Sequence, residues 1–95
     1  MCGICGIIGS SNPGTLEAMT DAIAHRGPDA DGFYQQDDVS LGHRRLSIVD
    51  VQHGQQPMTD ENGVVVVFNG EIYNHPVLQK ELEAEAPYQT NSDTE

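Results

Sequence analysis

Two segments of the chain place apolar side chains three or four residues apart, the spacing of one face of an α-helix. The first runs from Thr15 to His25 before Gly27-Pro28, and the second runs from Pro76 to Ala86 before Pro87. The apolar positions are Leu16, Met19, Ala22 and Ile23 in the first, and Leu78, Leu82 and Ala86 in the second. Thr15 or a neighbour can cap the first helix, and proline is tolerated in the first turn of the second. The pattern predicts two short amphipathic helices.

Other apolar stretches predict β-strands. Residues 3–8 form one before a turn at 10–14, and residues 32–36 form another that ends at Asp37-Asp38. Residues 39–49 alternate imperfectly and contain Gly42 and Arg44-Arg45, and the polar residues 50–63 are expected to form a long connection. Residues 63–68 are continuous and β-branched, which predicts a strand buried on both faces. Residues 88–95 are a further candidate strand.

The order of these elements indicates the fold class. Strands follow one another through hairpins as well as through helices, which favours an α+β domain over an alternating α/β domain. We expect an antiparallel sheet covered by helices on one side.

Composition and charge narrow the function classes. Ninety-five residues with 37% hydrophobic content suit one domain, or part of one, with a modest core. A net charge of -11 argues against nucleic-acid partners and against an anionic membrane surface. The sequence shows neither a membrane-spanning apolar run nor a secretory signal, so a cytoplasmic location with reduced thiols is expected.

The second residue is a cysteine, Cys2, directly after the initiator methionine. Methionine is commonly removed before a small residue, and Cys2 would then carry a free α-amine beside its own thiol. Such a residue holds both a nucleophile and a base. On position alone, a nucleophile and an accident of the terminus are equally good interpretations.

Cys2 and Cys5 also form a C-x-x-C pair, which is typical of redox and zinc sites. Residues three apart on a strand point to opposite faces, and no second cysteine pair completes four zinc ligands. We therefore expect Cys5 to be an inert core residue. The four histidines show no metal-binding spacing and are expected to be structural or exposed.

Three further positions offer chemistry, each beside a simpler interpretation. Arg45 can cover the sheet with its stem, or its fork can bind a substrate carboxylate. Asn69-Gly70 can be a type I′ hairpin turn, or a side-chain amide and a backbone N–H that form an oxyanion hole. Glu71 and Asp93 can bind an ammonium group, although most of the fifteen acids are expected to be solvated.

Six motifs together resemble the glutaminase domain of glutamine-dependent asparagine synthetases, which are class II glutamine amidotransferases and N-terminal-nucleophile hydrolases. They occur in the family's order and span nearly the whole chain. They are Met1-Cys2-Gly3-Ile4, His25-Arg26-Gly27-Pro28-Asp29, Arg45-Leu46-Ser47-Ile48-Val49-Asp50, Gln56-Pro57-Met58, Phe68-Asn69-Gly70-Glu71-Ile72-Tyr73-Asn74 and Ser92-Asp93-Thr94-Glu95.

The resemblance implies a role for each matching residue and a mechanism. Cys2 would be the nucleophile that forms a γ-glutamyl thioester, with its α-amine as the proton shuttle, and Asn69 and Gly70 would form the oxyanion hole. The glutamine substrate would be held as follows: its α-carboxylate by Arg45, its α-ammonium by Glu71 and Asp93, and its side by the backbone of Ile48 and Val49.

The resemblance also implies an α/β/β/α sandwich, of which this chain would contain about the first half. The synthetase domain, with its ATP and Mg²⁺, would be absent, so residues 1–95 would need no cofactor and no metal. The expected activity is release of ammonia from glutamine for asparagine synthesis. The alternative is a catalytically silent fragment or assembly module. The expected partners are glutamine and either a second copy or a missing C-terminal portion, which would cover the open sheet edges and complete the fold.

Overall fold

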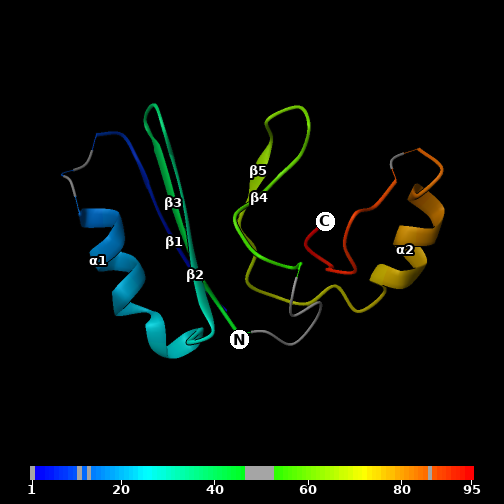
Figure 1. The fold of residues 1–95 in the computed structure, drawn as a ribbon, viewed down its shortest axis with the longest axis horizontal. Coiled ribbons are helices and arrows are strands. Elements are labelled where there is room, and N and C mark those ends of the chain that lie inside the picture. Colours follow the sequence, from blue (N-terminus) through cyan, green and yellow to red (C-terminus); the bar gives the residue numbers. More distant parts are fainter. Residues whose placement is uncertain (1, 11, 13, 47–52, 86) are drawn as a thin grey trace.

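The computed structural model of the chain describes residues 2–10, 12, 14–46, 53–85 and 87–95. Its elements are β1 (Gly3–Ile8), α1 (Thr15–Ala22), the 3-10 turn η1 (Ala24–Arg26), β2 (Ala30–Gln36), β3 (Val39–Arg45), β4 (Met58–Thr59), β5 (Val65–Val66) and α2 (His75–Leu82). Figure 1 shows α1 on one side of the β1–β3 strands, the β4–β5 pair on the other side, and α2 beyond that pair.

The main sheet has three antiparallel strands in the order β1-β3-β2. Gly42 of β3 pairs with Cys5 of β1 and with Phe33 of β2, so these three positions share one face of the sheet. The next residue of β3, His43, pairs with Ile4 and Gly32, and these positions share the other face. The two-residue turn between β2 and β3 places Asp37 at a φ of 55°, a conformation that aspartate tolerates. The mixture of helix and antiparallel sheet agrees with the predicted α+β class.

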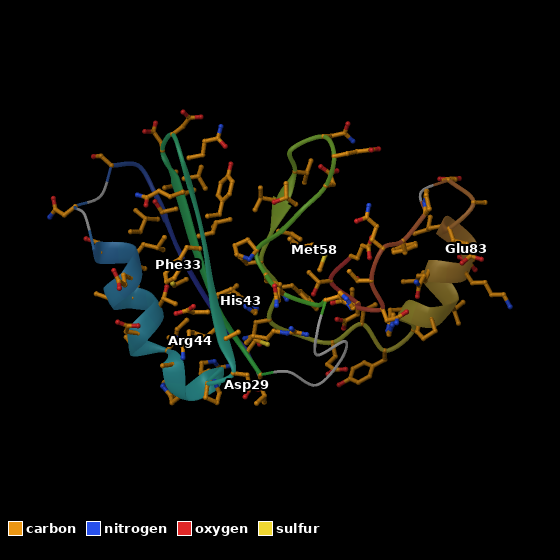
Figure 2. The ribbon with its side chains drawn as sticks, viewed as in Figure 1. Asp29, Phe33, His43, Arg44, Met58 and Glu83 are labelled. Carbon is orange, nitrogen blue, oxygen red and sulfur yellow. The ribbon has the colours of Figure 1, made fainter. Side chains whose placement is uncertain are left out.

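Helix α1 covers the face of the sheet that carries Gly42. A Cβ at Gly42 would collide with the Thr20 hydroxyl and the Cys5 sulfur, so the glycine lets the helix approach closely. The helix packs on β3 and β1, which leaves Phe33 of β2 45% exposed on the same face. Figure 2 shows Phe33 and Arg44 on the α1 side of the strands. The helix begins after Gly14 with no side-chain cap, so a capping role for Thr15 is wrong.

The predicted strand at 63–68 is wrong in length and in burial. Only Val65–Val66 form β5, and Val64 is 64% exposed. Within the described residues β5 pairs with β4 alone, and no other helix or strand makes an extensive contact with it. The connection predicted at 50–63 in turn contains β4, because Met58 and Thr59 supply the partner for Val66 and Val65.

The C-terminal part also differs from the prediction. Helix α2 ends at Leu82, contains no buried residue, and makes no extensive contact with the main sheet, so one helix rather than two covers that sheet. Residues 88–95 form turns instead of a strand, because the Glu95 carboxylate accepts hydrogen bonds from the backbone N–H groups of Gln89 and Thr90. None of the helices in the described ranges is long and apolar enough to cross a membrane.

Candidate active site

A small cavity lies at the edge of the main sheet, next to Cys2 and the end of β3. Its volume is about 70 Å³, room for a few water molecules. The residues that line it come from five segments: Cys2; Arg45 and Leu46; Gly54 and Gln56; Phe68, Asn69, Gly70 and Glu71; and Ser92, Asp93 and Thr94. The register of β1 on β3 pairs Gly3 with Arg44, and this brings Cys2 beside Arg45.

The Cys2 thiol contacts the backbone of Leu46, the residue after β3. The Leu46 N–H donates to the Cys2 sulfur over 3.4 Å, and the thiol lies 3.8 Å from the Leu46 carbonyl oxygen. The Cys2 carbonyl accepts a hydrogen bond of 3.0 Å from Nε of Arg26. The sequence analysis gave Arg26 no role of its own, although this residue lies in the motif His25-Arg26-Gly27-Pro28-Asp29.

Cys5 lies on the opposite face of β1. Its sulfur contacts the Thr20 hydroxyl of α1 at 3.4 Å, and both cysteines are free thiols. The two sulfurs therefore have separate surroundings, as expected for residues three apart on a strand.

Arg45 is only 5% exposed, which contradicts the interpretation of a surface residue. Its carbonyl accepts the Asp29 N–H at 3.0 Å, which anchors the end of β3. A buried guanidinium needs anionic or hydrogen-bonding partners, and its five N–H donors suit a carboxylate. At the cavity wall Arg45 can bind such a group.

Asn69 and Gly70 do not form a type I′ turn. That turn needs positive φ at both central residues, and neither has it; no strand follows them within the described residues. Oδ1 of Asn69 is buried without a hydrogen-bond partner in the described part of the chain. Asn69 also lines the cavity, so its side-chain NH₂ group is a candidate donor to an anion bound there.

The two acids reach the same cavity from different segments. Oδ2 of the half-buried Asp93 accepts the Ile72 N–H at 2.9 Å, and this bond joins the C-terminal turn to the segment of Glu71. Glu71 is exposed. The structure thus brings together six predicted site residues, Cys2, Arg45, Asn69, Gly70, Glu71 and Asp93. The predicted residues Ile48 and Val49 lie outside the described residues.

His43 and Gln56 are two neighbours of the site to which the sequence analysis assigned no role. His43 is 1% exposed, and its Nε2 lies 3.3 Å from the Phe68 carbonyl oxygen. Burial lowers the pKa of His43; the bond to Phe68 opposes this effect and the charge of Arg45 adds to it. His25 and His53 are exposed and His75 is partly exposed.

A cysteine thiol can attack a carbonyl carbon, and a side-chain amide can bind the oxyanion that forms. A buried arginine and two carboxylates beside them can bind the carboxylate and the ammonium group of an amino acid. Comparison with known proteins identifies the class. A family model described as "Glutamine amidotransferase domain" matches residues 1–95. The chain belongs to this family.

Two of its relatives carry more specific names. The chain is 41% identical over 104 residues to "Asparagine synthetase [glutamine-hydrolyzing] 1" of Bacillus subtilis (strain 168), a match that covers 100% of the chain and 16% of the relative. It is 40% identical over 101 residues to "Asparagine synthetase [glutamine-hydrolyzing] 1" of Arabidopsis thaliana, covering 100% of the chain and 17% of the relative. The chain therefore spans about a sixth of the length of these relatives.

Proposed function

We propose that this chain hydrolyses the side-chain amide of glutamine to glutamate and ammonia. The observation that carries the proposal is that the Cys2 thiol shares one cavity with Arg45, Asn69 and Asp93, residues far apart in sequence. Membership of the glutamine amidotransferase family supplies the substrate class.

The proposed reaction starts once Met1 has been removed. The freed α-amine of Cys2 takes the thiol proton, and the thiolate attacks the amide carbon of glutamine. The carbon–nitrogen bond then breaks, the amine returns the proton to the leaving nitrogen, and ammonia departs. A γ-glutamyl thioester remains on Cys2. Water, deprotonated by the same amine, adds to the thioester, and glutamate leaves while the thiol is regenerated.

The oxyanion of each tetrahedral intermediate would be bound by the Asn69 NH₂ group and the Gly70 N–H. Donors already in place cost no reorganisation during the reaction, and one such donor typically contributes about 10²–10³ in kcat. The position of Asn69 in the cavity lining, with Cys2, supports this role.

The remaining residues would bind the amino-acid end of the substrate. Arg45 suits the α-carboxylate, and Asp93 and Glu71 suit the α-ammonium group. Because these three charged residues line the same cavity as Cys2, the amino-acid end of the substrate would bind there beside the thiol. The backbone of Ile48 and Val49 is proposed to complete the pocket.

We further propose that the ammonia serves asparagine synthesis in a longer protein, where a synthetase domain would use ATP and Mg²⁺. The names of the relatives support this assignment. We also propose that the main sheet belongs to an α/β/β/α sandwich of the N-terminal-nucleophile type. Helix α1 packed on the main sheet fits two adjacent layers of such a sandwich.

Glutamate release by the 95-residue chain, with Met1 removed, tests the function. Cys2→Ala should abolish release, and a glutamine-analogue diazoketone should label Cys2, as mapped by peptide mass spectrometry. Cys5→Ala is the matched control, because it removes a thiol on the opposite face of β1 and should keep most activity.

Three results would contradict the proposal: release that persists in Cys2→Ala, an adduct at another residue, or a folded and trimmed chain with neither release nor labelling. The last result would support a silent assembly module. Full turnover by a chain with an uncleavable residue before Cys2 would refute the α-amine as the base.

A further inference from the structure

Phe68 precedes the proposed oxyanion residue Asn69, and side chains hold the peptide groups on both sides of it. Its N–H donates to Oε1 of Gln56 at 2.6 Å, and its carbonyl oxygen lies 3.3 Å from Nε2 of His43. The Phe68 carbonyl and the Asn69 N–H belong to one planar peptide unit. A bond that fixes the carbonyl therefore also fixes the start of Asn69.

These side-chain bonds matter because the segment has no backbone ladder. Strand β5 ends at Val66, and Phe68, Asn69 and Gly70 make no backbone–backbone hydrogen bond among the described residues. A segment without such bonds opens easily. Its conformation depends on the side chains that reach it.

Gln56 joins this segment to two other parts of the site. Its backbone lies against Gly32 of β2, where an added Cβ would collide with the Gln56 carbonyl oxygen. Its Nε2 donates to the Thr94 hydroxyl at 3.0 Å, next to Asp93. Gln56 thus links the segment before the oxyanion donors to the turn that carries an ammonium-binding acid.

His43 holds the other side of Phe68 from within the sheet. Since a carbonyl oxygen only accepts, the hydrogen bond requires the ring proton on Nε2, and Nδ1 is then a bare acceptor. Nδ1 is buried without a partner in the described part of the chain. A buried ring with one unpaired nitrogen is less favourable than an apolar side chain of the same shape. The hydrogen bond to Phe68 is therefore the feature that accounts for a histidine at position 43. Figure 2 shows the labelled residue at the sheet, between α1 and the β4 segment.

We infer that His43 and Gln56 are positioning residues that hold the Phe68–Asn69 peptide, and with it the oxyanion donors, against Cys2. This inference rests on the proposed glutaminase function. Neither residue needs to touch the reacting atoms.

The role of His43 is tested with two variants. His43→Phe keeps a ring but has no hydrogen-bond donor, and His43→Gln keeps an N–H donor of similar reach. We expect His43→Phe to lower kcat about tenfold, less than loss of an oxyanion donor itself, with KM within about twofold. His43→Gln should recover most of kcat. Binding of glutamate γ-semialdehyde, which forms a tetrahedral adduct with the thiol, should weaken with kcat, whereas binding of the product glutamate should not.

The role of Gln56 is tested with Gln56→Ala, and Gln55→Ala, at the exposed neighbouring residue, is the matched control. Gln56→Ala should lower kcat about tenfold and speed amide hydrogen exchange at Phe68, and Gln55→Ala should do neither. Thr94→Val removes only the link to Thr94, so exchange at Phe68 should stay slow. Circular dichroism and thermal melts verify that each variant folds.

Unchanged kcat in a folded His43→Phe, equal losses in His43→Phe and His43→Gln, or unchanged Phe68 exchange in Gln56→Ala would overturn the inference. Its failure is distinguishable from failure of the proposed function. An unmodified chain without glutamate release contradicts the function, and the exchange measurement at Phe68 still decides whether the Gln56 contact holds the segment.

Discussion

Replacing Asn69 with alanine should separate activity from stability. Asn69 is proposed to donate to the oxyanion, and its own Oδ1 is buried without a partner among the described residues. Removing one oxyanion donor typically lowers kcat by about 10²–10³, equivalent to about 2.7–4 kcal/mol. The same change removes an unsatisfied buried oxygen, which costs the folded state about 1–3 kcal/mol.

The two effects on stability partly cancel. Alanine recovers the desolvation cost of Oδ1 but loses the packing of the amide, so we expect a free energy of unfolding that is unchanged or higher by up to about 1 kcal/mol. For a chain of this size, 1 kcal/mol corresponds to a shift in Tm of about 4–8 °C. Glutamate release measures the loss of activity, and calorimetry measures the change in stability.

Asn62→Ala is the matched control, because Asn62 is an exposed asparagine in the turn before β5. It should leave both kcat and Tm close to those of the unmodified chain. A parallel fall of kcat and Tm in Asn69→Ala would contradict the proposed oxyanion role, since it would mean that the amide supports the fold rather than the reaction.

Three further predictions concern the fold. Burial lowers the pKa of His43 below 6.5 in the folded chain, so the unfolded chain binds more protons in mild acid. The stability from this group is full above about pH 6.5 and falls as the pH drops through the lower folded pKa. Urea unfolding between about pH 8 and pH 5 should show this dependence, and His43→Gln should remove most of it. Gly42→Ala should lower the free energy of unfolding by about 1–3 kcal/mol, because the new methyl meets the Thr20 hydroxyl; an unchanged melting curve would contradict the close contact of helix and strand. Ile8 is 80% exposed on the sheet face opposite α1, so we expect weak self-association in sedimentation experiments that Ile8→Asp abolishes and Val77→Asp on α2 does not.

The sequence predicted the elements whose signals are local. Strand β1 was predicted with its observed bounds, and the turn at Asp37-Asp38 was predicted between the strands that it joins. Helix α1 was recognised from Leu16 and its apolar companions, since these residues share one helical face. The histidines were expected to be structural or exposed, and the buried His43 and the exposed His25 fit that expectation.

Elements that depend on partners were predicted poorly. Residues 63–68 have the composition of a buried strand, but the length of a strand is set by the neighbour that pairs with it, and β4 offers only Met58 and Thr59. Residues 88–95 became turns because a single carboxylate, that of Glu95, binds two backbone N–H groups. Neither cause is visible as a periodic pattern.

For the site, the residue types are visible in the sequence, including an N-terminal cysteine, an arginine in an apolar strand and an Asn-Gly pair. That Cys2, Arg45, Asn69 and Asp93 line one cavity, and that Arg45 is buried there, follows from the folded structure alone. The same is true of the contacts that hold Phe68 from both sides. The physical reason is that such contacts join residues distant along the chain, and their geometry follows from strand register and close packing rather than from local preference.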